Sequence, residues 1–190
     1  MSKDFEKDIE ACLKTLNNKG TILYPTDTVW GLGCDVTNEM TVNKIFEIKN
    51  RPKHKSFIVL VNSFAMLKHY VSDVNNNLIN FLSAIEKPTT VIYNNVQGFA
   101  PSVYADDGSV AIRVCKDEFC NELINRFDKP IVSTSANISG EPTARFFSEI
   151  NPAIIQATDY TVFYKREALI PAAPSAIVQF IEDGIKIIRE

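Results

Sequence analysis

Apolar positions along the chain switch between two periods, which predicts helices alternating with strands. Residues 3–18 carry apolar side chains at helical spacing, and Gly20 lies just beyond them, where a helix commonly ends. The apolar run Ile22-Leu23-Tyr24 then predicts a short buried strand. This strand should stop at Pro25, because proline has no N–H with which to continue a central ladder.

A second helix and a second strand follow. Asn38 is a residue type that caps helices, and apolar side chains recur behind it at helical spacing. The helix should end by Arg51, because Pro52 disfavours helical backbone in the residue before it. Residues 57–61 form an unbroken apolar run, which predicts a strand buried on both faces.

The rest of the chain repeats this alternation. Further helices are expected at residues 67–70, 78–85 and 119–127, and a weakly helical stretch at 146–157. Further strands are expected at residues 89–93, 109–114, 131–132, 160–164, 176–180 and 185–188. Residues 170–175 are rich in proline and are expected to form a rigid loop, not a domain linker. We therefore predict an α/β protein with one domain over residues 1–190.

Composition and charge exclude some classes of protein. The 190 residues are 45% hydrophobic and 23% charged, which is ordinary for a soluble globular protein. The net charge of −3 argues against bulk electrostatic binding of nucleic acid, although a local basic patch is still compatible with it. No apolar run approaches the roughly 20 residues of a membrane helix, and the N-terminus does not resemble a secretory signal. The expected location is the cytoplasm.

The cysteines and histidines do not indicate a metal site. Four cysteines and two histidines are present, without a Cys-x-x-Cys pair or another spacing typical of metal ligands. Buried, reduced thiols are the better interpretation. The sequence also has no Ser-His-Asp or Cys-His arrangement for nucleophilic catalysis.

Two predicted strands run directly into small polar side chains. The first is followed by Thr26-Asp27-Thr28, and residues 131–132 are followed by Ser133-Thr-Ser135-Ala-Asn137. Ligands of open α/β sheets bind in the crevice at the strand ends. For the first string, a ligand site and a solvated turn explain the residues equally well, whereas the second favours a polar ligand cradle. Gly31 and Gly33 predict a sharp turn or a close approach to the backbone.

Two groups of cations are candidates for binding anions. Residues 49–55 (Lys-Asn-Arg-Pro-Lys-His-Lys) are the only dense positive charge, and they suit either a triphosphate or a solvated basic loop. Arg113 lies within an apolar strand, where a buried guanidinium needs an anionic partner. The side chain of Arg113 therefore either extends its charged end to water or meets an anion, which is a substrate carboxylate or an acidic residue of the chain.

Taken together, these stretches resemble the YrdC family, whose characterised members are L-threonylcarbamoyladenylate synthases. The matching pieces lie in the family's order along nearly the whole chain: Tyr24-Pro-Thr-Asp-Thr28-Val-Trp-Gly-Leu32, Lys49-x-Arg51-Pro with Lys55, Ser109-Val-Ala-Ile-Arg113-Val, Ser133-x-Ser135-Ala-Asn137-x-Ser-Gly140-Glu-Pro, and Pro174-Ser175-Ala-Ile-Val178 before Arg189. The resemblance implies a twisted, mostly mixed sheet flanked by helices and curving around a large cavity. It also implies a nucleotidyltransferase without the extra C-terminal domain of longer members.

The implied reaction converts L-threonine, bicarbonate and ATP, with Mg²⁺, into threonylcarbamoyl-AMP and pyrophosphate. A separate transferase then uses the product to make threonylcarbamoyladenosine on tRNAs that read codons beginning with A. By this resemblance, the threonine site comprises Thr28, Arg113, Ser133 and Ser175. The ATP site comprises Arg51, Lys55, Ser109, Ser135, Asn137, Thr143 and Arg189, and the catalytic cations are Lys49, Arg51 and Lys55.

Three positions depart from the family pattern. Leu60 replaces a histidine found near the threonine in many members, Glu86-Lys-Pro88 replaces Pro-Gly-Pro, and Ala176 replaces a threonine after Ser175. Two other hypotheses therefore stay open. One is a non-catalytic module that contacts tRNA or double-stranded RNA through residues 49–55, although the acidic net charge argues against it. The other is a paralogue that acts on a different acceptor.

Overall fold

The computed structural model describes residues 4–52, 56–168, 173–181 and 184–190. Within these ranges the strands form one nine-stranded sheet in the order β7-β1-β2-β6-β3-β5-β4-β8-β9. Its strands are β1 (Ile22–Tyr24), β2 (Gly31–Gly33), β3 (Ile58–Val61), β4 (Thr89–Tyr93), β5 (Val110–Val114), β6 (Ile131–Ser135), β7 (Tyr160–Thr161), β8 (Ala176–Ile181) and β9 (Gly184–Arg189). The helices are α1 (Glu6–Asn17), α2 (Glu39–Ile48), α3 (Phe64–Tyr70), α4 (Asn76–Ala84), α5 (Glu118–Phe127) and α6 (Pro152–Ala157), with single 3₁₀ turns at Pro101–Val103 and Phe147–Glu149.

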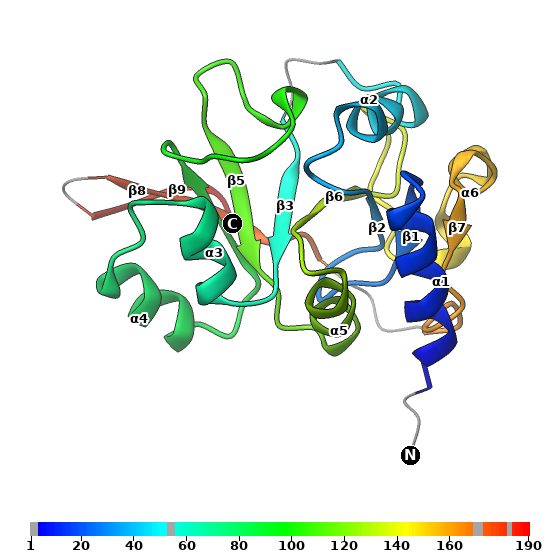
Figure 1. Ribbon diagram of the computed structural model, residues 1–190, viewed down its shortest axis with the longest axis horizontal. Helices are drawn as coiled ribbons and strands as arrows, with labels where there is room; N and C mark the ends of the chain where they lie inside the picture. The colour runs from blue at the N-terminus through cyan, green and yellow to red at the C-terminus, as the bar shows by residue number, and fades with distance from the viewer. Residues whose placement is uncertain (1–3, 53–55, 169–172, 182–183) are drawn as a thin grey trace.

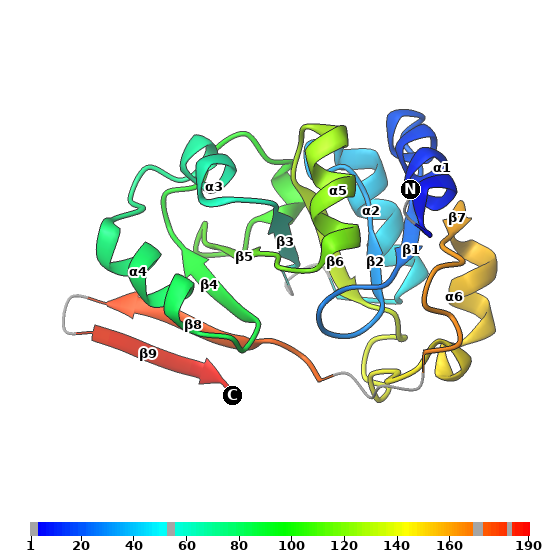
Figure 2. The same ribbon diagram turned by 90° about the horizontal axis from the view of Figure 1, so that it is seen from below.

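The sheet is mixed, as predicted. β1 pairs with β7, β3 with β5, and β4 with β8 in parallel, whereas the other neighbours are antiparallel. β6 joins the two parts of the sheet, since Ile131–Ser133 pair with β3 and Thr134–Ser135 pair with β2. Figures 1 and 2 show β8 and β9 at one end of the molecule, and α1, α6 and β7 at the other.

Alternating residues of the central strands serve two different purposes, because successive side chains point to opposite faces of a sheet. Val59, Ile112 and Val132 belong to a hydrophobic core that also contains apolar side chains of α2, α3 and α4. Their neighbours in sequence, Ile58, Arg113 and Ser133, line a cavity. A second core packs α1 and α5 against β1.

Most of the predicted elements are present. β1 ends at Tyr24, directly before Pro25, and β4 has the expected bounds. The side chain of Asn38 caps α2 by accepting a hydrogen bond from the backbone N–H of Thr41 at 3.1 Å. Ser63 caps α3 in the same way, accepting from the N–H of Met66 at 3.1 Å. All four cysteines are buried and free, as expected.

Three strands differ from what the sequence indicated. Gly31–Gly33 form strand β2 where a turn was one expectation, and β6 continues through the polar residues to Ser135. β7 includes only Tyr160–Thr161 of the strand expected at 160–164. At Gly33, an added Cβ would lie 2.2 Å from the carbonyl oxygen of Val132. The glycine therefore permits the close approach of β2 to β6, which is the alternative that the sequence left open.

None of the helices in the described ranges is both long enough and apolar enough to cross a bilayer. The predicted loop at 170–175 lies partly outside these ranges.

Candidate functional site

A cavity of about 300 Å³ lies on one face of the sheet. Ile58 and Ser133 are among the residues that line it. Its walls come from distant parts of the chain: the loop after β1, the strands β3, β5 and β6, and the C-terminal strands β8 and β9. Eight residues predicted from the sequence line it together: Thr28, Arg51, Arg113, Ser133, Ser135, Thr143, Ser175 and Arg189. The fold therefore gathers most of the predicted threonine and ATP residues in one place.

Arg113 is the buried cation of this cavity, with only 4% of its side chain exposed. Its Nη2 donates hydrogen bonds to Oδ1 of Asp27 at 2.9 Å and to Oγ1 of Thr28 at 3.2 Å. Its Nε is buried and has no partner among the described residues. The sequence left open whether Arg113 pairs with a ligand or with an acidic residue, and the structure places Asp27 beside it.

A second guanidinium is held at the same cavity by the backbone. Arg189 donates from Nε and Nη2 to the carbonyl oxygen of Ser175, at 3.2 and 2.8 Å. The hydroxyl of Ser175 in turn shares a hydrogen bond of 2.8 Å with that of Thr90. Burial, followed by the positive charge of Arg113, lowers the pKa of Arg189. Two neighbouring guanidinium groups thus make this part of the cavity favourable for an anion.

Lys49 is placed differently from the prediction that it acts directly on a ligand. Its side chain is 1% exposed and does not line the cavity. Its Nζ donates to the carbonyl oxygens of Ser135 and, at 2.7 Å, Asn137. Burial lowers the pKa of Lys49 to about 7, and the charge of Arg51 contributes to the same shift. Lys49 therefore holds the end of β6 and the loop that follows it.

The other predicted cations and polar residues are divided between the cavity and its surroundings. Arg51 lines the cavity, donates from Nη2 to the carbonyl oxygen of Ser56 at 2.8 Å, and lies over the ring of Phe57. Burial lowers the pKa of Arg51. Lys55 lies outside the described residues.

Ser109 and Asn137 do not line the cavity. The backbone N–H of Ser109 donates to Oδ1 of Asp107 at 3.0 Å within a turn. Asn137 donates from Nδ2 to the carbonyl oxygens of Ile138 and Glu141, so its side chain organises the loop after β6. Ser109 thus belongs to the turn before β5, and Asn137 belongs to the loop after β6.

The sequence did not assign two residues that the structure places in contact with the site. Asp27 pairs with Arg113, and its place between two threonines at a strand end was the available signal. Thr90 pairs with Ser175, but a threonine within a β-rich run is too common to be noticed. No group of three or more histidine, cysteine, aspartate or glutamate residues suited to a metal ion occurs in the part of the chain described.

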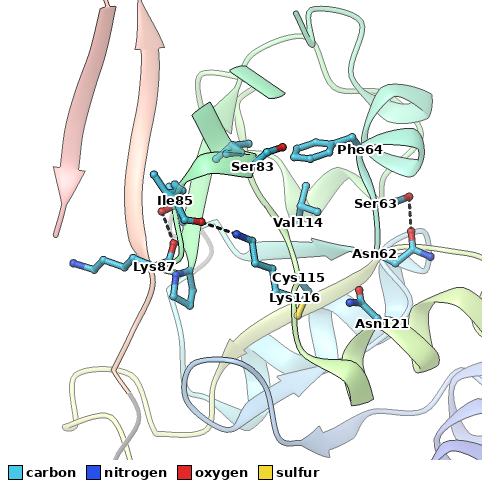
Figure 3. A pocket seen from close by; sticks show the side chains of 13 residues that line it. Asn62, Ser63, Phe64, Ser83, Ile85, Lys87, Val114, Cys115, Lys116 and Asn121 are labelled. Atoms are coloured by element: carbon cyan, nitrogen blue, oxygen red, sulfur yellow. Dashed lines mark hydrogen bonds between the residues drawn. The ribbon is translucent and has the colours of Figure 1, made fainter. Parts of the chain in front are cut away.

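A larger cavity, of about 460 Å³, lies beyond the carboxyl ends of β3 and β5 (Figure 3). It contains none of the predicted site residues. Lys116 reaches across it and donates from Nζ to the carbonyl oxygen of Ile85 at 2.6 Å, and Ser63 donates to Oδ1 of Asn62 at 2.8 Å. Among the described residues, its lining has the lysines Lys87 and Lys116 but no arginine to bind an anion in bidentate fashion, so the 300 Å³ cavity is the better candidate for an anionic substrate.

Comparisons with known proteins show which family the chain resembles. A family model for Sua5, YciO and YrdC proteins, described as telomere recombination, matches residues 14–190. A threonylcarbamoyl-AMP synthase of Xanthomonas campestris pv. campestris (strain B100) is 35% identical over 156 residues, which are 80% of this chain and 83% of that protein. The synthase of Xanthomonas euvesicatoria pv. vesicatoria (strain 85-10) is 35% identical over 175 residues, 90% of this chain and 91% of that protein.

Solved structures share the fold at lower sequence identity. Sua5 of P. abyssi complexed with L-threonine has a TM-score of 0.85 and 22% identity, over 99% of this chain. The matched region is 55% of that Sua5 chain, so the present chain spans about half its length. YciO of E. coli has a TM-score of 0.83 and 19% identity, over 97% of this chain and 89% of that protein.

Proposed function

The chain belongs to the Sua5/YciO/YrdC family, and we propose that it is a threonylcarbamoyl-AMP synthase. The reaction forms L-threonylcarbamoyl-AMP and pyrophosphate from L-threonine, bicarbonate and ATP, for threonylcarbamoyladenosine synthesis on tRNA. The observation that carries this proposal is that Arg113, Arg189 and a set of hydroxyl groups line the same cavity. It suits a substrate that carries an amino-acid carboxylate at one end and phosphates at the other.

We assign L-threonine to the part of the cavity formed by Thr28, Arg113, Ser133 and Ser175. The guanidinium of Arg113 provides the charge for the α-carboxylate. Because Nη2 already donates to Asp27 and Thr28, the donors open to that carboxylate are Nε and Nη1. The hydroxyls of the two serines and Thr28 are suited to the polar groups of the amino acid.

We assign ATP to the remaining walls, where Arg51, Ser135, Thr143 and Arg189 lie. Lys55 would contribute a further cation, and Ser109 and Asn137 would support the nucleotide from beside the cavity. Lys49 acts through the backbone, since its ammonium group holds the carbonyl oxygens of Ser135 and Asn137. Mg²⁺ would arrive with the nucleotide and offset the charge on its phosphates.

The chemistry needs positioning and charge more than a reactive side chain. The amine of threonine takes up carbon dioxide from bicarbonate to form a carbamate. An oxygen of the carbamate attacks the α-phosphorus of ATP, and the bond to pyrophosphate breaks. Negative charge develops on the phosphates, and fixed guanidinium groups stabilise it. Seclusion in a cavity protects the labile product from water.

The product would then pass to a separate threonylcarbamoyl transferase that acts on tRNA. We place the reaction in the cytoplasm, where ATP and tRNA are both present.

The direct test is pyrophosphate release from ATP, measured with and without L-threonine and bicarbonate, with L-serine as the control amino acid. We expect release to require both, and a product with the mass of threonylcarbamoyl-AMP. A folded protein that binds ATP but releases no pyrophosphate would instead indicate a paralogue with another acceptor. A folded protein that binds RNA and not ATP would support the RNA-binding hypothesis.

A further inference from the structure

We propose that Asp27 is a positioning residue that fixes the guanidinium of Arg113 and sets the charge of the amino-acid end of the cavity. The proposal rests on the function given above, because it assigns a role within the same site. It starts from a buried ion pair: Nη2 of Arg113 lies 2.9 Å from Oδ1 of Asp27, and their side chains are only 4% and 13% exposed. A buried pair of this kind contributes orientation more than net stability.

Asp27 is itself held rigidly by its neighbours. Oγ1 of Thr26 accepts a hydrogen bond from the backbone N–H of Thr28 at 3.0 Å and donates to the carbonyl oxygen of Val29 at 2.8 Å. The hydroxyls of Thr26 and Thr28 also share a hydrogen bond of 2.9 Å. These hydrogen bonds within residues 26–29 restrict the conformation of the loop between β1 and β2, and they fix the position of Asp27.

The carboxylate of Asp27 contacts β5 and a residue just after it. Oδ1 accepts from Arg113, and Oδ2 lies 3.5 Å from the backbone N of Lys116, just beyond the end of the strand. The side chain of Lys116 extends away into the second cavity, where it reaches the carbonyl oxygen of Ile85 (Figure 3). Asp27 thus ties the loop after β1 to the end of β5 and restricts where the guanidinium can turn.

The pair also determines how much positive charge a ligand meets. Asp27 offsets the positive charge of Arg113, whereas Arg189, in the wall assigned to ATP, keeps its charge. The amino-acid end therefore has less net positive charge than the walls assigned to ATP, and an α-carboxylate carries less negative charge than the phosphates do. Asp27 thereby makes this end of the cavity suited to the amino acid and leaves the phosphates of ATP to the other walls.

The test compares two variants of Asp27, Asp27→Ala and Asp27→Asn, with a control variant, Glu6→Gln. The control breaks an exposed ion pair, between Glu6 and Arg126, that does not belong to the cavity. For Asp27→Ala we expect the KM for L-threonine to rise by at least roughly tenfold, while the KM for ATP changes much less. Asp27→Asn keeps an acceptor oxygen and should lie between Asp27→Ala and the wild type. Glu6→Gln should match the wild type.

A double-mutant cycle separates positioning from a general structural effect. In an Arg113→Ala background, Asp27→Ala should not raise the KM for L-threonine further, because its partner is already absent. Additive effects, or equal changes in the KM values for threonine and ATP, would overturn the proposal. Tighter binding of threonine by Asp27→Ala would also overturn it, since Asp27 would then compete with the substrate for Arg113.

An NMR measurement made without substrate tests the role of Asp27 independently of whether the protein is a threonylcarbamoyl-AMP synthase. The Nε–H signal of Arg113 in NMR spectra, assigned by its loss in Arg113→Lys, should be sharp in the wild type and broadened in Asp27→Ala. An unchanged signal would overturn positioning even if the enzyme is active. If the wild type neither binds L-threonine nor releases pyrophosphate, the proposed function fails, and the signal still decides whether Asp27 fixes Arg113.

Discussion

At the scale of single residues, the buried cations have two different roles. Arg113 lines the cavity, whereas Lys49 does not line it and donates to the backbone carbonyl oxygens of Ser135 and Asn137. The sequence singled out Arg113 because it lies in an apolar strand, without deciding whether its guanidinium is buried, and it grouped Lys49 with the basic run that follows. A signal was present, because Lys49 continues the buried stripe of Val42, Ile45 and Phe46 at helical spacing. A charge run alone does not reveal which of its members point inward.

Arg113→Lys tests the shape of the cation separately from its charge. Lysine keeps the positive charge but loses the planar set of donors that guanidinium offers to a carboxylate and to Asp27. We expect the KM for L-threonine to rise roughly tenfold or more, with a smaller change in the KM for ATP. Steady-state kinetics with each substrate varied in turn give both values. Equal increases would contradict the assignment of Arg113 to the threonine.

The lowered pKa of Lys49 predicts that the stability of the protein depends on pH. Its pKa is lowered from 10.5 to about 7 in the folded protein, so between these values the unfolded chain binds more protons at this residue. The free energy of unfolding should therefore rise with pH above about 7, by less than about 1.4 kcal/mol per pH unit. Below pH 7 the lysine is protonated in both states, and its contribution no longer changes.

Urea unfolding at several pH values, for the wild type and Lys49→Met, measures this term. The difference in free energy of unfolding, wild type minus variant, should increase between pH 7 and pH 10. The matched control is Lys68→Met, which removes an exposed lysine of α3 and should give a constant difference. A constant difference for Lys49→Met as well would contradict the lowered pKa.

At the scale of elements, the contact between β2 and β6 depends on the absence of a side chain. A Cβ at Gly33 would lie 2.2 Å from a backbone oxygen, whereas at Gly31 the nearest atoms belong to the side chains of Ser133, Thr26 and Tyr24, at 3.1–3.2 Å. The sequence did not predict β2, because Gly-Leu-Gly has little intrinsic preference for a strand. Pairing with β1 and β6 decides its conformation, and a local pattern does not contain that information.

Gly33→Ala should accordingly destabilise the protein by about 1–3 kcal/mol or more, because two backbones must separate. Gly31→Ala should cost less stability, since side chains can shift by a few tenths of an ångström. Its methyl group would press on Ser133, so it should affect the KM for L-threonine more than Gly33→Ala does. Thermal melting and kinetics of the two variants make the comparison. A larger loss of stability in Gly31→Ala would contradict it.

At the scale of the whole molecule, the cavity is built where β6 joins the two parts of the sheet. One wall comes from residues near Thr28 and the other from Ser175 and Arg189, which are far away in sequence. Hydrophobic periods predicted most strands and helices, and the resemblance to a family supplied the site residues. The strand order could not be derived, because the apolar pair Ile131-Val132 predicts a short strand but not that this strand lies between β2 and β3.

A ligand that bridges both walls should stabilise the molecule as a unit. With L-threonine and ATP each at about one hundred times its Kd, we expect Tm to rise by roughly 10–20 °C. Amide hydrogen exchange should slow in both β6 and β8. D-threonine is the control, because its carboxylate and side chain cannot both occupy the same positions. Protection confined to one wall would contradict a shared site.

The alternation along the central strands also bears on how sequence variation is tolerated. In β5, Val110 and Ile112 belong to the hydrophobic core, whereas Ala111 and Arg113 line the cavity. A saturation scan of this strand should therefore give two interleaved classes of loss-of-function variants. Changes at Val110 and Ile112 should reduce the amount of the protein in cells. Changes at Ala111 and Arg113 should leave that amount near normal but prevent the gene from complementing a strain that lacks the enzyme. The effects of substitutions two positions apart in β5 would then resemble each other more than the effects of substitutions at adjacent positions.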